Sequence, residues 1–207
     1  MRMSRPHTIR TVFLATAAAG LAITAAAPVA AATTPAPAPT FLSAGELPAS
    51  LTPWTAGAVR RGLPEVGSPC TAGTAPSARS RYRDFRTELD TGARQTVTVA
   101  TTTAGAKALA AKLRTAVETC LDRLAEQDPG LEGEASHQGR IAVEDGAHVH
   151  SVDTSSPGTG TTDIRLLSVG RDGRAVTVVE WWQLGELDGA PLTGFKKTTR
   201  TAVAKLY

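Results

Sequence analysis

The sequence predicts an α+β domain in which an antiparallel sheet of about six strands, built from three hairpins, carries two helices packed on one face. Strand-like segments occur in three pairs, and each pair is interrupted by a glycine of the kind found in hairpin turns. Two other segments repeat their apolar residues every three or four positions, which places those residues on one helix face. The chain of 207 residues is long enough for one such domain after a leader is removed.

Residues 1–32 have the features of a secretory signal peptide. A basic start with three arginines and no acidic residue is followed by an apolar run at 11–27 and by small residues suited to cleavage. The alternative, a retained membrane helix, would use a run near the lower length limit for spanning a bilayer. We expect the leader to be removed, which leaves a secreted, extracellular protein without a membrane anchor.

The charge balance changes once the leader is removed. The remaining chain carries 19 basic and 19 acidic residues, because all the charge in the leader comes from its three arginines. A neutral chain has no general electrostatic reason to bind nucleic acid or an anionic membrane. We therefore expect a partner of another kind.

A short spacer separates the leader from a single domain at 41–207. The spacer, residues 33–40, is rich in proline and alanine and has the composition of an extended linker. The domain opens with Ser43 and Glu46 three residues apart, which is the pattern of a capping box and predicts a short helical turn. Irregular chain rich in proline and glycine, which includes Trp54, follows this turn.

The two cysteines, Cys70 and Cys120, predict one disulfide. An even number of cysteines in an exported chain favours pairing. Such a bond would close a loop of 50 residue steps, and chain-entropy reasoning gives it about 4 kcal/mol of stability. The alternatives are two free thiols or a metal site. No histidine or further cysteine flanks either cysteine at short spacing, so we expect no metal.

The first predicted hairpin pairs residues 81–89 with 94–100 around the Thr-Gly pair at 91–92. A two-residue loop would mix apolar and polar side chains on each face. A register shifted by one pairs Phe85 with Val99 and separates the two kinds of side chain. Because a one-residue slip exchanges the faces of a strand, the pattern favours a loop of odd length.

Two helices are predicted from apolar periodicity, one at 103–125 and one at 191–206. In the first, the residues that recur on one face are Leu109, Leu113, Val117, Cys120 and Leu124. One cysteine therefore lies on the buried stripe of the longest helix. The predicted disulfide would tie this helix to the chain just ahead of the first strand.

The second hairpin pairs residues 139–144 with 147–153 about an Asp-Gly dipeptide at 145–146, which favours a type I′ turn. Alternation places His148 and His150 on one face of this hairpin. Two imidazoles on one strand face can bind a metal or hold a proton near neutral pH. A metal would still need a third ligand, and the other interpretation is a partly solvated strand face.

The third hairpin pairs residues 162–170 with 174–183 about a second Asp-Gly dipeptide. A two-residue loop there sets Arg165 opposite Glu180, with Trp182 beside them. A cross-strand charge pair is ordinarily structural, but an aromatic side chain beside a fixed charge pair can also orient a small ligand. Both faces of this hairpin are largely apolar, so we expect it to be central in the sheet.

Motifs of common enzymes are absent from the sequence. There is no G-x-S-x-G, H-E-x-x-H, phosphate-binding loop or G-x-G-x-x-G pattern. Ser151 directly follows His150, but alternation points it to the opposite face, where the two histidines cannot activate it. We therefore expect no enzymatic activity, no catalytic residues and no cofactor.

The order of these parts resembles the PknH-like extracellular sensor domain. The resemblance covers residues 41–207 and rests on the opening FLSAGELP, on Cys70 ahead of the first strand, and on AKLRTAVETC, which carries Cys120. It continues through GRIAVEDGAHVHSVD and DIRLLSVGRDGRAVTVVEWW to the closing GFKKTTRTAVAKLY. Members occur on receptor Ser/Thr kinases or as free secreted and lipoprotein copies, and the resemblance implies ligand sensing through a groove. The family commonly has a second disulfide in its later strands, where this chain has no cysteine.

These features predict a secreted, non-enzymatic, sensor-like domain that acts as a monomer and binds a small ligand or an extracytoplasmic partner protein. The candidate ligand-binding residues are Arg165, Glu180, Trp182, His148 and His150. One alternative is a hydrolase of unfamiliar design that uses His148 or His150. The other is a protein-interaction or inhibitor module that acts through the segment around Trp54.

Overall fold

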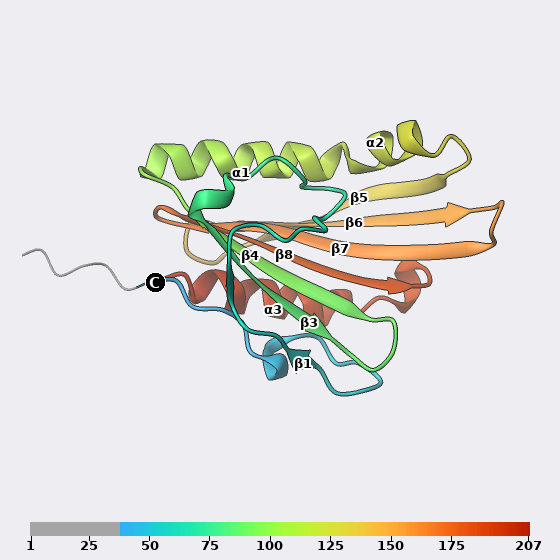
Figure 1. Cartoon of the computed structure of the whole chain (residues 1–207), viewed down its shortest axis with the longest axis horizontal. Helices are drawn as coiled ribbons and strands as arrows, with labels where there is room; N and C mark the ends of the chain where they lie inside the picture. The colour runs from blue at the N-terminus through green and yellow to red at the C-terminus, as the bar shows by residue number, and fades with distance from the viewer. Residues whose placement is uncertain (1–37) are drawn as a thin grey trace, which may run out of the picture. The chain divides into compact units, whose positions relative to one another are not determined.

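The computed structural model describes residues 38–207, so the predicted signal peptide and most of the spacer lie outside the described residues. Within this range one antiparallel sheet is flanked by helices (Figure 1). The strands are β1 (Thr55–Ala56), β2 (Arg60–Arg61), β3 (Ser80–Arg86), β4 (Gly92–Val99), β5 (Glu132–Ile141), β6 (Ala147–Ser156), β7 (Thr161–Asp172) and β8 (Ala175–Leu184). The helices are α1 (Thr103–Glu118), α2 (Cys120–Gln127) and α3 (Leu192–Ala204), with short 3-10 turns η1 (Ala44–Glu46), η2 (Ser77–Arg79) and η3 (Leu187–Gly189).

The strand order across the sheet is β1-β3-β4-β8-β7-β6-β5, and β2 also pairs with β3. Every pairing is antiparallel. The hairpin of β7 and β8 lies near the middle of this order, which confirms the central position predicted for it. The pairing of β4 with β8 brings the first hairpin beside the third, although α1, α2, β5 and β6 separate them in sequence.

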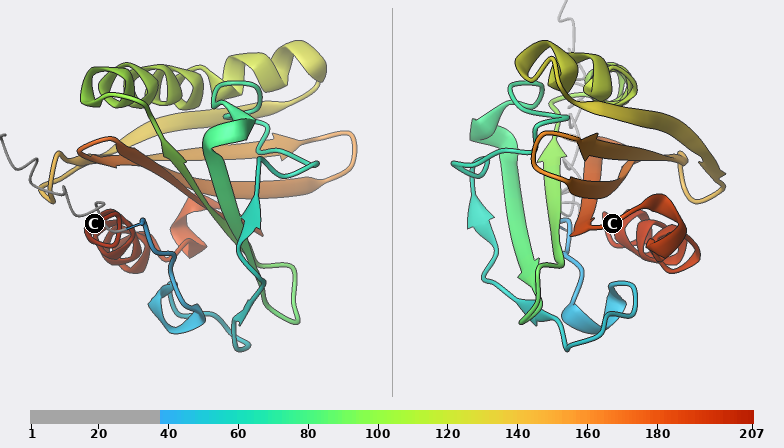
Figure 2. Two further views of the ribbon diagram at one scale, coloured as in Figure 1. Left: turned by 60° about the vertical axis from the view of Figure 1, so that its left-hand side comes forward. Right: turned by 90° about the vertical axis from the view of Figure 1, so that its right-hand side faces the viewer.

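The helices cover both faces of the sheet, as Figures 1 and 2 show. The buried residues of α1 are Ala106, Leu109, Leu113 and Val117, and those of α3 include Phe195, Ala202 and Val203. The two sets belong to separate cores, one on the α1 side of the sheet and one on the α3 side. The prediction of both helices on one face is therefore wrong. Strand β7 buries Leu166 toward α3 and Leu167 toward α1, so each face is apolar and each needs a cover.

The sheet has eight strands and the described chain has three α-helices, where about six strands and two helices were predicted. The additional strands, β1 and β2, are two residues each and come from the segment expected to be irregular. The additional helix arises because the predicted helix at 103–125 is interrupted at Thr119. The Thr119 hydroxyl donates to the carbonyl of Thr115 at 3.0 Å, a contact that bends helices.

The first hairpin has the predicted odd-length loop but a different turn. Phe85 pairs with Ala93 rather than with Val99, and the loop spans residues 87–91. Gly92 therefore lies within β4 and is not a turn residue. It is glycine because a Cβ at this position would collide with the indole ring of Trp182 on the neighbouring strand β8.

The second and third hairpins also differ from prediction in their turns. The loop between β5 and β6 spans residues 142–146 and is not a two-residue turn. Its Asp145 carboxylate instead accepts a hydrogen bond from the backbone N–H of Gly173, at 2.8 Å in the adjacent hairpin. The third hairpin turns at 173–174, so Leu166 pairs with Trp181. This register differs from the predicted one by two residues, and each side chain keeps its predicted face.

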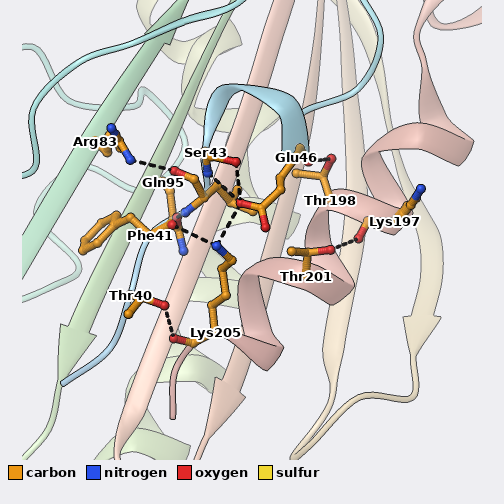
Figure 3. Close-up of polar contacts among 11 residues, drawn as sticks. Thr40, Phe41, Ser43, Glu46, Arg83, Gln95, Lys197, Thr198, Thr201 and Lys205 are labelled. Atoms are coloured by element: carbon orange, nitrogen blue, oxygen red, sulfur yellow. Dashed lines mark hydrogen bonds and ion pairs between the residues drawn. The ribbon is translucent and has the colours of Figure 1, made fainter. Parts of the chain in front are cut away.

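The segment ahead of β1 is held against α3 (Figure 3). Ser43 and Glu46 form the predicted capping box, in which the Ser43 backbone N–H donates to Glu46 Oε2 at 2.7 Å. The Lys205 ammonium pairs with the same carboxylate oxygen at 2.9 Å. The Thr198 hydroxyl donates to the Glu46 carbonyl at 2.7 Å. These contacts join η1 to the last helix and close the α3-side core.

Candidate functional site

The predicted disulfide between Cys70 and Cys120 is present, with 4.8 Å between the two Cα atoms. Both cysteines are fully buried. The Arg123 guanidinium reinforces the connection, since its Nη2 donates to the carbonyl oxygens of Cys70 at 2.7 Å and Ala116 at 2.6 Å. The segment from Leu63 to Ala75, here called the covering segment, is thereby fastened to the junction of α1 and α2.

A cavity of about 230 Å³ lies between the covering segment, α1 and strands β4 and β8. We call it the disulfide-side cavity. Its apolar lining comes from Leu113 of α1 and from Val176 and Val178 of β8, together with Leu63, Pro64, Ala72 and Ala75 of the covering segment. Its polar lining from the sheet is Arg94, Thr96, Thr98 and Glu180. An apolar cavity with a few convergent polar groups is typical of a small-molecule site.

Two opposite charges reach this cavity from neighbouring strands. Arg94 and Glu180 are direct partners across β4 and β8. The Glu180 side chain is buried, and its Oε1 accepts a hydrogen bond from Arg165 Nη1 at 3.1 Å. Arg94 donates to Asp84 Oδ1 at 2.6 Å and to the Val66 carbonyl of the covering segment at 2.8 Å. Both charges are therefore held in place by partners of their own.

Of the predicted groove residues, Glu180 lines the cavity, while Arg165 and Trp182 lie further along the same face. Arg165 is directly opposite Trp182, and it reaches Glu180 diagonally instead of straight across the strands. The Trp182 indole covers Gly92. The structure thus brings Arg165, Glu180 and Trp182 together on the α1 side, but only Glu180 reaches the cavity lining.

The prediction missed the contributions of β4 and of the covering segment to the cavity. The contribution of β4 could have been found from the alternation of Arg94, Thr96 and Thr98, because it marks a polar stripe on a strand whose other face is largely apolar. The contribution of the covering segment leaves no local signal in the sequence. The covering segment reaches the sheet because a disulfide and an arginine hold it there.

Three histidines meet on the α1-facing side of the β5–β6 hairpin. His148 and His150 share this face as predicted, and His137 of β5 joins them across the ladder. The ring centroid of His137 lies 4.8 Å from that of His150 and 5.4 Å from that of His148. The sequence prediction missed His137 because it began this strand at residue 139, whereas β5 begins at Glu132. An irregularity between His137 and Gly139 then sets His137 opposite His150.

A directed hydrogen-bond chain fixes the tautomers of two of these rings. Arg114 Nη1 lies 3.0 Å from His148 Nε2 and can only donate, so this ring nitrogen is the acceptor. The His148 proton is then on Nδ1, which faces His137 Nε2 at 3.3 Å. The imidazole of His148 is neutral in this arrangement, and the lone pair of its Nε2 accepts the hydrogen bond from Arg114.

Burial lowers the pKa of both predicted histidines. For His148, partial burial is the largest cause, and the charges of Arg114 and His137 add to it. For His150, burial lowers the pKa to about 4, with a further contribution from His137. Both rings are therefore neutral at pH 7. Within residues 38–207 no group of three His, Cys, Asp or Glu side chains is arranged to hold a metal ion.

The Trp54 segment forms part of the edge of the α3-side core. The Trp54 side chain packs against that core, and its indole Nε1 donates to the Pro48 carbonyl at 2.7 Å. Leu51, three residues earlier, is 94% exposed. Leu51 is the large apolar side chain that this segment exposes, and it lies beside an open hollow lined by residues 44–45 and 47–54.

No known protein-family model matches the sequence, and a comparison with curated proteins finds no match. Among solved structures, the fold has a weak likeness to the crystal structure of the extracellular domain of PknH from Mycobacterium tuberculosis. The TM-score is 0.38 and the sequence identity 10%, over 79% of this chain and 97% of that one. No helix in the described part of the chain has the length and apolar character needed to cross a bilayer.

Proposed function

We propose that this protein is a secreted, non-enzymatic domain that binds a small ligand in the disulfide-side cavity. The observation that carries the proposal is the cavity itself, in which apolar side chains of α1, β8 and the covering segment share one space with the polar residues Glu65, Arg94, Thr96, Thr98 and Glu180. The disulfide agrees with an oxidising, extracytoplasmic location. The signal-like leader supports the same location, and we propose that the protein acts as a monomer.

The lining specifies the chemistry of the ligand. At about 230 Å³ the cavity fits a compact molecule whose apolar body lies against Leu113, Val176 and Val178. The guanidinium of Arg94 already has two hydrogen-bond acceptors, whereas the Glu180 carboxylate has one guanidinium donor. A ligand with a donating group, such as a small amine, would give Glu180 a second donor.

The hydrolase alternative has less support than ligand binding. A histidine base needs a free ring nitrogen beside a nucleophile. The Nε2 of His148 accepts from Arg114, and Ser151 pairs with Leu166 on the α3 side of the sheet. The interaction-module alternative also has less support, because the Trp54 ring itself is engaged in the fold and Leu51 is the large apolar side chain that the segment exposes.

The test compares ligand binding by the wild type and by two variants of the full chain. Thr96→Phe places a ring in the cavity, whereas Thr161→Phe makes the same change at an exposed position of β7. Native mass spectrometry of protein exported by its own host would detect a bound molecule, and benzylamine serves as a defined probe in ligand-observed NMR. We expect binding by the wild type and the Thr161 variant, and its loss in the Thr96 variant. Equal binding by the Thr96 variant, or no ligand and no probe bound by the wild type, would refute the proposal.

A further inference from the structure

A second hollow, of about 400 Å³, lies on the opposite flank of α1 from the disulfide-side cavity. We call it the basic hollow. Its walls come from the middle of α1 and from β5, β6, β7 and the loop between β5 and β6. Its charged and titratable lining residues are Lys107, Arg114, Arg140, Arg171, Asp145 and His148. No residue lines both cavities.

The positive charges in the basic hollow exceed the negative ones. Asp145 is the only carboxylate in the lining, and Arg171 Nη1 pairs with it at 2.6 Å. The remaining cations, Lys107, Arg114 and Arg140, form no ion pair within residues 38–207. Like charges that converge without counter-charges destabilise a folded protein, so three of them around one hollow indicate a site for an anion.

The local geometry directs the two arginines, Arg114 and Arg140, at the hollow. The Arg140 guanidinium lies over Gly146, where a Cβ would come within 3.0 Å of its Nη2. Arg114 is partly buried and donates to the neutral ring of His148, which orients the guanidinium without neutralising its charge. Glu118, one turn further along α1, does not line the hollow. The positive charges therefore come from three separate elements, α1, β5 and β7, while β6 contributes the neutral His148.

We propose that the basic hollow binds a tetrahedral oxyanion, the phosphate or sulfate group of a small molecule. Guanidinium groups present paired N–H donors that match two oxygens of such a group, and Lys107 adds a point charge. The hollow is open on one side, which leaves room for the remainder of the ligand. The proposal is independent of the ligand cavity on the other flank of α1, and either can fail without the other.

The experiment measures the binding of inorganic phosphate and of sulfate to the full chain, with sodium chloride at matched ionic strength as the control. Backbone amide signals of Gly146 and Gly170, which line the hollow, report the location by NMR. We expect these signals to shift with phosphate or sulfate and not with chloride.

Three variants distinguish a site from general attraction to a basic surface. Arg140→Gln and Lys107→Gln each remove one lining charge, and we expect each to weaken binding by about tenfold. Lys112→Gln removes an exposed charge of the same helix that does not line the hollow, and it should leave binding unchanged. Equal effects of all three variants, or equal shifts with chloride, would overturn the proposal.

Discussion

Acid should destabilise this protein through His150, which is buried in the neutral form. The residue is 4% exposed, and within the described chain its Nε2 has no hydrogen-bond partner. The groups around it are His137 of β5, His148 of the same strand, and Arg114 and Glu118 of α1. All except Glu118 disfavour a proton on the His150 ring. The folded protein therefore resists protonation at this position, whereas the unfolded chain accepts a proton freely.

The magnitude follows from the difference in pKa between the two states. The pKa of His150 is 6.5 in the unfolded reference and about 4 in the folded protein. Above pH 6.5 both states hold a neutral ring, so this residue has no pH-dependent effect on stability. As the pH falls from 6.5 toward about 4, only the unfolded state gains the proton. The free energy of unfolding should decrease over this range by at most roughly 3 kcal/mol, and it should level off below it.

Urea unfolding followed by tryptophan fluorescence, repeated across this pH range, measures the decrease. The variant His150→Gln is the control, because its amide does not titrate while the carboxylates and His148 are retained. We expect the variant to lose less stability on acidification than the wild type, by roughly 3 kcal/mol at most. The reasoning would be refuted by identical pH profiles, or by an NMR titration in which the folded His150 ring has an ordinary histidine pKa.

Two further predictions concern covalent and steric features of the fold. Replacing Cys70 and Cys120 together by serine should lower the free energy of unfolding by about 4 kcal/mol, measured by urea unfolding without reductant; a loss near zero would contradict the entropic argument. Gly92→Ala should cost about 1–3 kcal/mol because its methyl group meets the Trp182 ring, whereas Gly189→Ala, with no atom near its Cβ, should cost little. Thermal unfolding would compare the two glycine variants, and equal melting temperatures would contradict the collision.

The face on which each strand residue lies could be predicted from the sequence, but the turns could not. Side chains alternate with a period of two, so the predicted and observed pairings of β7 with β8 differ by two residues and agree in every face. A glycine, in contrast, can be required either by a turn or by the close approach of another side chain. Gly92 was interpreted as a turn residue, yet it is required by the ring of Trp182, which is 90 positions later in the chain.

The position of the helices was predictable from an observation that the sequence already offers. Both faces of the third hairpin are apolar, and a sheet that is apolar on two sides must be covered on two sides. The same pattern that places β7 and β8 in the middle of the sheet therefore also predicts a helix on each face. Helix periodicity shows which side of α1 or α3 is buried, and it carries no information about which face of a sheet receives it.

The two candidate sites depend on α1, because the same helix forms one wall of each. Its inward stripe fixes Leu113 against β8, and the residues beside that stripe set the chemistry of the flanks. On one flank the covering segment, held by the disulfide, encloses an apolar space. On the other flank, an open hollow is lined by Lys107 and Arg114 of α1, by Arg140 of β5 and by Arg171 of β7. Each site combines residues far apart in sequence, which is why alternation within one hairpin could identify Glu180 and His148 but not their neighbours.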